Sequence, residues 1–267
     1  MKISVIITNF NGEVFLDQAI KSFLDQDYEN KELIIVDGIS KDKSHQIIEK
    51  YAQQNPLQIK WIKEVDSGIS NARNIALKHV SGDLIGFLGS DDILHQDFFK
   101  NLSYYLKVDD KFDVAYFNNY CVGKSYSYNL GCQHSITFRN LIKYCPIASG
   151  EAFYYKKSIF DYFKFNEHNR YSMDYELNLA ISSFKSASKS TSKNKYLFFP
   201  IDLVAVINRD TGLNQSSLNS KKQRLESIAV QLKYADNFLI KIKIIIRSYK
   251  LFIKNYRQIL NYLKILS

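Results

Sequence analysis

Two adjacent carboxylates, Asp91 and Asp92, follow a short apolar stretch that ends at Gly89. The stretch, residues 84–88, predicts a buried strand, and the glycine predicts the end of that strand. Neighbouring carboxylates repel each other, so their position at a strand end favours a cation or a hydrogen-bonded ligand beside them. We predict that the pair holds a divalent metal and a nucleotide-linked substrate. Aspartate is also common in polar turns, so the pair needs support from other residues.

Three more polar positions follow predicted strands nearer the N-terminus. They are Thr8 with Asn9, then Asp37, then Asp66. The preceding strands alternate with helical patterns: strands at 2–8, 32–36 and 58–63, helices at 13–26, 43–54 and 70–79. This alternation predicts a parallel sheet with helices on its faces, and ligands bind such sheets beyond the carboxyl ends of the strands. All four polar positions are therefore expected along one edge of one sheet.

The chain beyond the aspartate pair also mixes strands and helices. Its patterns predict helices at 96–106, 137–144, 157–163 and 174–184, strands at 112–118, 151–155, 196–199 and 203–207, a hairpin or loop at 121–132, and an exposed loop at 186–194.

Composition and missing motifs exclude several classes of protein. A hydrophobic content of 46% with only 3 prolines indicates a packed globular chain. Three widely spaced cysteines without a histidine cluster argue against a zinc site or a disulfide framework, and they fit a reducing cytosol. No Gly-x-Gly-x-x-Gly follows the first strand, so the dinucleotide fingerprint is missing. A Gly-Lys-Ser occurs at 123–125, but Asn118 stands where a P-loop carries its first glycine, so the P-loop is missing too. The first residues predict a strand rather than a signal peptide.

Five segments together carry a resemblance to a known family. They are residues 4–12 (SVIITNFNG), 32–42 (ELIIVDGISKD), 66–74 (DSGISNARN), 82–92 (GDLIGFLGSDD) and 173–177 (MDYEL). In this order they resemble the family 2 glycosyltransferases, which have the GT-A fold. The resemblance implies an α/β protein with a Rossmann-like, mainly parallel central sheet and helices on both faces. We expect a nucleotide-sugar-binding half at 1–100, an acceptor-side half of the same domain at 101–217, and a basic, amphipathic helical tail at 218–267.

The resemblance implies roles for the residues around the donor. Thr8 and the backbone at Asn9 would lie under the nucleotide, and Asp37 would accept a hydrogen bond from the nucleobase. Asp66 and Arg73 would line the base and the ribose. The residues alone leave alternatives open, because Arg73 could instead pair with an acidic neighbour and Asp37 could cap the helix that follows it.

The resemblance also assigns the chemistry. Asp91 would face the ribose or the donor sugar, Asp92 would bind Mn²⁺ or Mg²⁺, and Asp174 would act as general base. The metal neutralises charge on the departing nucleoside diphosphate, and a positioned carboxylate accelerates proton removal by about 10²–10⁴-fold. Asp174 could instead cap its own helix, with Glu176 as the alternative base.

The implied activity is inverting transfer of a sugar from a nucleotide-sugar to a hydroxyl group of a glycan or lipid-linked acceptor. We expect a UDP-linked donor and a role in bacterial surface polysaccharide synthesis. The sequence departs from the family pattern at 148–151, where relatives often carry His-Gln, and at 211–216, where they carry Gly-Gly-x-Ser. These departures leave the acceptor open, and the alternative is a nucleotide-sugar-binding protein without turnover.

The C-terminal segment concentrates the positive charge. Residues 238–267 hold seven Lys or Arg and no Asp or Glu, so the net charge of +9 does not predict nucleic-acid binding by the remainder. A spacing of seven residues predicts a basic stripe on an apolar helix, formed by Lys243, Lys250, Arg257 and Lys264 beside Arg247, Lys254 and Asn261. We expect this helix to lie on anionic lipid at the inner face of the cytoplasmic membrane, without spanning it. Alternatively, it packs on its own domain or on a second subunit of an oligomer.

Overall fold

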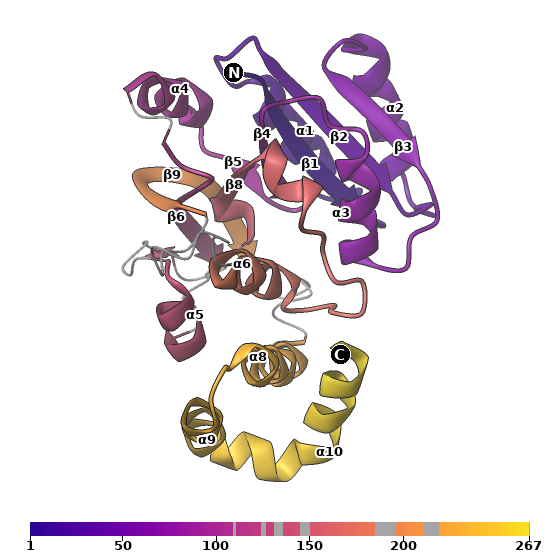
Figure 1. The fold of residues 1–267 in the computed structure, drawn as a ribbon. Helices are drawn as coiled ribbons and strands as arrows, with labels where there is room; N and C mark the ends of the chain where they lie inside the picture. The colour runs from indigo at the N-terminus through magenta and orange to yellow at the C-terminus, as the bar shows by residue number, and fades with distance from the viewer. Residues whose placement is uncertain are drawn as a thin grey trace.

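A mixed sheet organises the computed structural model, which describes residues 1–108, 111–123, 127–130, 136–144, 150–184, 196–210 and 219–266 (Figure 1). The strand order is β3-β2-β1-β4-β8-β6-β9-β5, and β7 pairs with β6. The predicted α/β class is confirmed, with helices on both faces of the central sheet.

The first four strands run parallel to one another. They are β1 (Ile3–Asn9), β2 (Lys31–Asp37), β3 (Ile59–Lys63) and β4 (Leu84–Gly89). Helices α1 (Leu16–Leu24), α2 (Ser44–Gln54) and α3 (Ile69–Leu77) connect them, as the alternating pattern predicts. Because the helices cover both faces, every residue of β2 and all of β1 except Thr8 are buried, and the central residues 5–7 and 33–36 are apolar, which is typical of buried parallel strands.

The second part of the sheet is built mostly from antiparallel pairs. It comprises β5 (Ile93–Leu94), β6 (Val114–Gly123), β7 (Ser127–Leu130), β8 (Phe153–Lys156) and β9 (Phe198–Asp210). The connecting segments hold α4 (Phe98–Val108), α5 (Phe138–Tyr144), α6 (Met173–Ser183) and the 3₁₀ turns η1 (Gly150–Ala152) and η2 (Lys157–Asp161). Since β8 runs antiparallel to β4, the residues before β8 lie at the carboxyl end of β4.

Alternate residues of β1 enter two separate cores. Ile3, Val5 and Ile7 pack with residues of α1, α2 and α4 on one face of the sheet. Ile6 belongs to the other core, which α3, α5, α6 and α8 complete. Successive side chains of a strand point to opposite faces of the sheet, so helices on both faces are needed to bury the apolar residues of β1.

Two predicted strands, at 196–199 and 203–207, form one strand, β9. Proline usually interrupts a central strand, but here a register irregularity opposite Pro200 accommodates the missing donor. The predicted hairpin is confirmed by the antiparallel pairing of β6 with β7. The predicted loop at 186–194 and the departures at 148–149 and 211–216 lie outside the described residues.

The C-terminal segment contains three helices: α8 (Ser220–Tyr234), α9 (Phe238–Arg247) and α10 (Tyr249–Leu266). Leu225 and Ala229 of α8 are buried in the core, so the first part of the predicted tail packs against the body of the protein.

The prediction of one helix with a continuous basic stripe is wrong, because the helix is interrupted at Ser248 and Asn255 has non-helical dihedral angles. Serine and asparagine compete with the helix for backbone hydrogen bonds, which favours such breaks. Within the described ranges, no helix is both long enough and apolar enough to cross a membrane.

Candidate active site

The carboxyl ends of β1, β2 and β4 lie side by side. Asn9 pairs in register with Asp37, and Thr8 pairs with Gly89, the last residue before the Ser-Asp-Asp segment. Parallel pairing therefore brings Thr8, Asn9, Asp37 and the aspartate pair to one edge, as the strand pattern predicts. We call this edge, together with the residues packed against it, the carboxyl edge.

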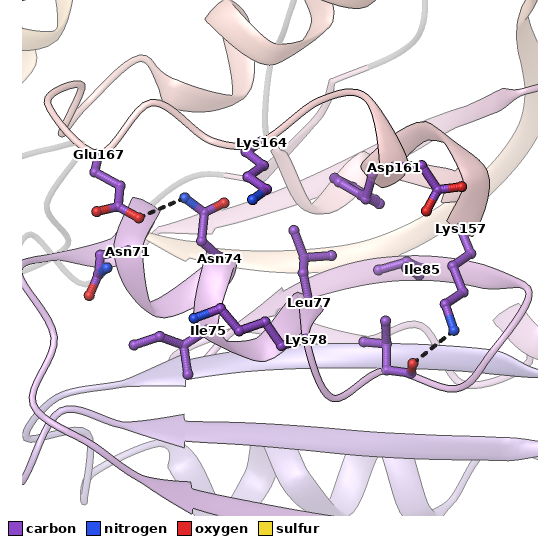
Figure 2. Close-up of a pocket in the computed structure, with 12 residues that line it drawn as sticks. Asn71, Asn74, Ile75, Leu77, Lys78, Ile85, Lys157, Asp161, Lys164 and Glu167 are labelled. Atoms are coloured by element: carbon purple, nitrogen blue, oxygen red, sulfur yellow. Dashed lines mark hydrogen bonds between the residues drawn. The ribbon is translucent and has the colours of Figure 1, made fainter.

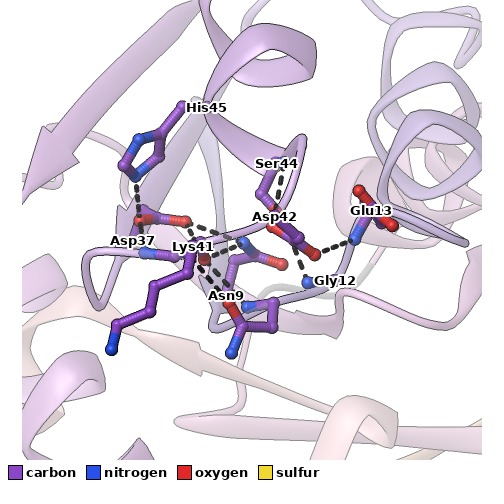
Figure 3. Close-up of polar contacts among 10 residues, drawn as sticks. Asn9, Gly12, Glu13, Asp37, Lys41, Asp42, Ser44 and His45 are labelled. Atoms are coloured by element: carbon purple, nitrogen blue, oxygen red, sulfur yellow. Dashed lines mark hydrogen bonds and ion pairs between the residues drawn. The ribbon is translucent and has the colours of Figure 1, made fainter.

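Asp37 is fully buried and joins the loops that follow β1 and β2 (Figure 3). It accepts hydrogen bonds from Nδ2 of Asn9 at 2.8 Å and from the backbone N and Oγ of Ser40 at 2.8 and 2.7 Å, and it lies 2.7 Å from Nε2 of His45. Burial raises the pKa of Asp37, but these hydrogen bonds outweigh burial and the net pKa is lowered. A carboxylate offers about four lone-pair positions, so a nucleobase could bond Asp37 only by replacing one of these partners. The nucleobase contact stays a prediction.

Asp66 and Phe10 flank the backbone of Gly38, next to Asp37. A Cβ at Gly38 would lie 2.5 Å from Oδ2 of Asp66 and 3.3 Å from the ring of Phe10, so a larger residue would displace them. Asp66 accepts a hydrogen bond from the backbone N of Gly68 at 2.8 Å, yet burial and the charge of Asp37 raise its pKa. The Phe10 side chain is 64% exposed. An exposed ring beside a carboxylate provides a surface on which a nucleobase can stack and form a hydrogen bond.

Asn9 directs a second polar atom toward Gly12, in the loop that follows β1. Its Oδ1 is buried, and no hydrogen bond to it is found among the described residues. A Cβ at Gly12 would lie 2.1 Å from this oxygen and 3.3 Å from Oγ of Ser90, so glycine leaves the space beside it open. Buried acceptors are normally satisfied, and this oxygen therefore suits a donor group of a bound ligand.

The aspartate pair converges beside Gly89. A Cβ at this glycine would lie 2.6 Å from Oδ2 of Asp92 and 2.9 Å from Oδ1 of Asp91. Strand β9 fixes Asp92, which accepts hydrogen bonds from Nδ2 of Asn208 and from the backbone N of Arg209, both at 2.8 Å. One oxygen of each aspartate thus approaches the same glycine.

The pKa values of the pair show that negative charge accumulates here. Burial, then the carboxylates of Glu151 and Asp91, raise the pKa of Asp92 well above its ordinary value. Burial is also the main cause of the raised pKa of Asp91, to which Glu151 adds. Within the described ranges no group of three His, Cys, Asp or Glu side chains could hold a metal ion. Mg²⁺ often takes only one or two carboxylates and completes its coordination with substrate phosphates, so the pair fits such an ion.

Asp174 lies in the first turn of α6 and forms an ion pair with Arg73. Ser172 is the N-cap residue of α6, so the structure does not give Asp174 the alternative capping role. A Cβ at Gly150 would lie 2.3 Å from Cγ of Asp174, and glycine is therefore needed to seat this carboxylate. Burial raises the pKa of Asp174, Arg73 opposes that shift and Glu151 adds to it. A raised pKa brings a carboxylate closer to the range that suits a general base near neutral pH.

Arg73 is buried behind Asp174. Its guanidinium carbon lies 4.7 Å from the ring centroid of Phe87 and 5.2 Å from that of Phe165, and Nη2 is 3.6 Å from Oε1 of Glu151. The structure thus agrees with the interpretation in which Arg73 pairs with acidic neighbours. Lining of the base and ribose by Arg73 stays a prediction, and with 3% of the residue exposed it offers little surface to a ligand.

Glu176, the alternative base, faces the packed side of α6. Its carboxylate accepts hydrogen bonds from Nδ2 of Asn166 at 3.2 Å and of Asn169 at 2.9 Å, and from Nζ of Lys233 at 3.1 Å. These contacts tie α6 to α8 and to the segment before α6. Glu176 is therefore a structural residue, and the role of Asp174 as general base stays a prediction.

Sequence reasoning missed three residues of the carboxyl edge: Glu151, Asn208 and Arg209. Glu151 lies in η1 and interacts electrostatically with the carboxylates at positions 91, 92 and 174. Asn208 and Arg209 lie near the end of β9. In the sequence, each of these residues is only a polar residue near a predicted strand. Such a pattern does not reveal that β8 runs antiparallel to β4, which is what brings Glu151 to the carboxyl edge.

A pocket of about 300 Å³ lies away from this edge, between α3 and residues 157–167 (Figure 2). Its polar lining groups bond one another: Nδ2 of Asn74 donates to Glu167 at 2.9 Å, and Nζ of Lys157 donates to the carbonyl of Val80 at 3.1 Å. The rest of its walls mixes apolar side chains with charged ones such as Lys78, Asp161 and Lys164, and none of the predicted site residues lines it. The carboxyl edge therefore remains the candidate active site.

Comparison with known proteins identifies related sequences. The profile of "Glycosyl transferase family 2" matches residues 4–163, more than half of the 267-residue chain. The minor teichoic acid biosynthesis protein GgaB of Bacillus subtilis is 37% identical over 115 residues, which are 42% of this chain and 13% of that protein. The poly(ribitol-phosphate) beta-N-acetylglucosaminyltransferase TarS of Staphylococcus aureus is 31% identical over 108 residues, which are 40% of this chain and 19% of that protein. The chain thus spans less than a fifth of the length of these two relatives.

Solved structures share the fold over nearly the whole chain. The crystal structure of S. aureus TarS in complex with UDP-GlcNAc has a TM-score of 0.70 at 20% identity, covering 98% of this chain and 80% of that chain. A mannosyltransferase from Pyrobaculum calidifontis, in complex with GDP-Man and Mn²⁺, has a TM-score of 0.62 at 16% identity, covering 99% and 74%. The predicted GT-A fold is confirmed.

Proposed function

The chain belongs to glycosyl transferase family 2, and from this premise we propose that it transfers a sugar from a nucleotide-sugar to a hydroxyl group of a glycan or lipid-linked acceptor. The observation that carries the proposal is the convergence of Asp174 with Asp91 and Asp92, all coupled electrostatically to Glu151. Glycosyl transfer needs a base for the acceptor hydroxyl and a site that stabilises the departing diphosphate. The carboxyl edge offers candidates for both.

The donor lies, in this proposal, along the ends of β1, β2 and β4. Its base stacks on the exposed ring of Phe10 and bonds Asp66, and its ribose donates to Oδ1 of Asn9. A uridine nucleotide is supported by the TarS structure of similar fold, which was determined with UDP-GlcNAc.

Asp91 and Asp92 would hold a divalent ion such as Mn²⁺ between the protein and the diphosphate of the donor. When bound, the ion supplies positive charge that offsets the charge developing on the leaving group. The raised pKa values of both carboxyls support this role, because a nearby cation relieves the repulsion that burial intensifies. The mannosyltransferase of similar fold was determined with Mn²⁺.

Asp174 would remove the proton of the acceptor hydroxyl as its oxygen attacks the anomeric carbon. A carbon–oxygen bond forms on one face of the sugar, and the nucleoside diphosphate leaves from the opposite face with the electron pair of its bond. One base on the acceptor side is sufficient for this inverting course. Arg73, buried among Phe87, Phe165 and Glu151, holds the carboxylate in place. The named activities of GgaB and TarS support a surface polysaccharide as the product.

The test compares Asp174→Asn with wild type in donor binding and in transfer. We expect UDP-sugar binding within about twofold of wild type and transfer lowered by about 10²-fold or more, because the base is lost and the fold is kept. Asp161→Asn, which changes an exposed carboxyl of η2, is the matched control and should leave both values unchanged. Transfer by Asp174→Asn at a near wild-type rate would exclude Asp174 as the base. Donor binding without any transfer by wild type, over a panel of acceptors, would favour a binding protein without turnover.

A further inference from the structure

Helix α9 has two apolar faces that lie on opposite sides. Ile244 is buried and belongs to the core formed with α6 and α8, and Ile240 packs partly against it. On the other side Phe238, Leu239 and Ile246 are 75%, 66% and 67% exposed. Phe238, Ile242 and Ile246 follow one another at the four-residue spacing of a helical face. A helix packed on the protein needs only its inward face to be apolar, so the outward face requires another explanation.

Exposed lysines border this outward apolar face. Lys241 and Lys243 are exposed and lie on either side of the row of apolar side chains on a helical projection. Helix α10 adds exposed Tyr249 and Leu260 and exposed Arg257. No Asp or Glu occurs from 238 to 267, against seven Lys or Arg. The outward faces of α9 and α10 therefore combine apolar side chains with positive charge.

The protein fixes the orientation of α9. Nη2 of Arg247 donates to Oε1 of Gln231 on α8 at 2.9 Å, and Nη1 donates to the backbone carbonyl of Lys143 on α5. Oδ1 of Asn237 caps the helix by accepting from the backbone N of Ile240 at 2.9 Å. Figure 1 shows α9 and α10 at the end of the molecule remote from β3 and α2. The apolar face is thus held outward on one end of the protein.

We propose that this surface, the outward faces of α9 and α10, binds an anionic lipid bilayer. Phe238, Leu239 and Ile246 enter the boundary between headgroups and acyl chains, and Lys241 and Lys243 meet the acidic headgroups. Charge complementarity selects this occupant, because a contact between two copies of the same surface would bring the exposed cations Lys241, Lys243 and Arg257 of each copy together. Binding to such a bilayer would bring the enzyme to the surface that carries a lipid-linked acceptor, a consequence that rests on the proposed function.

Vesicle flotation tests the electrostatic part. Full-length protein is mixed with vesicles of phosphatidylcholine alone or of phosphatidylcholine with phosphatidylglycerol. We expect binding to the anionic vesicles only, and a decrease of about tenfold or more in Lys241→Gln/Lys243→Gln. Lys21→Gln/Lys50→Gln, which removes two exposed lysines of α1 and α2, is the control and should bind as wild type does. Equal loss in the control would show that net charge alone drives binding, which overturns the proposal.

A second pair of variants tests the apolar part. Phe238→Ser/Ile246→Ser should also lower vesicle binding by about tenfold or more. Leu57→Ser/Tyr104→Ser changes two side chains that are more exposed but lie on other parts of the surface, and it should not lower binding. Sugar transfer to a soluble acceptor should be unchanged in both double variants. Failure of the membrane proposal can therefore be distinguished from failure of the proposed transferase activity. Unaltered vesicle binding by Phe238→Ser/Ile246→Ser would refute the proposal. So would conversion of a dimer to a monomer by this variant without any effect on vesicles, which would identify a second copy as the occupant.

Discussion

Ile39 adopts a backbone conformation that its side chain disfavours. Its φ of 62° lies in the left-handed region, where a β-branched residue is strained, and it sits between Asp37 and Ser40 in the loop that carries the buried carboxylate. The hydrogen bonds of Asp37 stabilise this loop. Strain of this kind persists where the surrounding contacts fix the backbone, as they do beside the candidate donor site.

Substitution of Ile39 tests that strain. We expect Ile39→Gly to be more stable than Ile39→Ala by about 1 kcal/mol, because alanine keeps a Cβ in the left-handed region and glycine does not. Both variants remove the same partly exposed side chain, so each serves as the control for the other. Urea unfolding gives the two free energies. Equal stability would indicate that position 39 is unstrained in solution.

Single residues also show where prediction from sequence succeeds and where it fails. The family segments that contain Asp92 and Asp174 occur in order along the chain, and this order predicts that both residues lie at the carboxyl edge, where the structure places them. Their roles in metal binding and proton removal stay predictions. The placement of Arg73 between two rings and two carboxylates depends on side chains from β4, η1 and α6, which no local pattern specifies. The sequence could therefore give both interpretations of Arg73 but could not choose between them.

Among the secondary-structure elements, Glu32 of β2 joins three segments. Its carboxylate accepts a hydrogen bond from Oγ of Ser4 on β1, accepts two from the backbone N and Oγ of Ser81 before β4, both at 2.6 Å, and pairs with Lys2 at 2.7 Å. Burial raises the pKa of Glu32, but these partners outweigh burial and lower it to about 2. A lowered carboxyl pKa adds stability above the ordinary pKa, and this stability is lost as the pH falls through the folded value.

Glu32→Gln should therefore destabilise the protein in a pH-dependent way. We expect a loss of about 2 kcal/mol in the free energy of unfolding at about pH 7, shrinking as the pH falls from about 5 toward about 2. Urea unfolding across this range measures it, with the exposed Glu29→Gln as control, expected within about 0.5 kcal/mol of wild type. A loss that does not change with pH would mean that Glu32 contributes through packing and not through its charge.

Elements were predicted best where the pattern is local. The four parallel strands and three helices of the first ninety residues follow from alternation of apolar runs and helical periodicity. The continuity of β9 across Pro200 and the break after α9 were not predicted. The first depends on a register shift next to Pro200, and the second falls at Ser248 in a segment whose apolar spacing continues across the break.

The whole molecule determines the charge of the carboxyl edge. The carboxylates at 91 and 92 follow β4, Glu151 precedes β8 and Asp174 begins α6, so the tertiary fold alone brings them together. Burial is the main cause of the raised pKa values of Asp91, Asp92 and Asp174. These groups bind protons more readily in the folded than in the unfolded state. Their contribution to the free energy of unfolding therefore falls as the pH rises from the ordinary carboxyl pKa through the raised values.

A divalent ion should reverse this loss. We expect Mn²⁺ to raise the temperature of unfolding at about pH 8 and to have little effect at about pH 4, because protonated carboxyls bind cations weakly. Asp92→Ala should abolish the Mn²⁺ effect, since Oδ2 of Asp92 and Oδ1 of Asp91 together approach Gly89. Asp161→Ala is the control, because its exposed carboxyl lies in η2 outside the edge, and it should respond as wild type does. Thermal unfolding with and without Mn²⁺ across this range is the measurement. An Mn²⁺ shift of the same size in Asp92→Ala would assign the ion to another part of the protein, and the raised carboxyl pKa values would then have no link to metal binding.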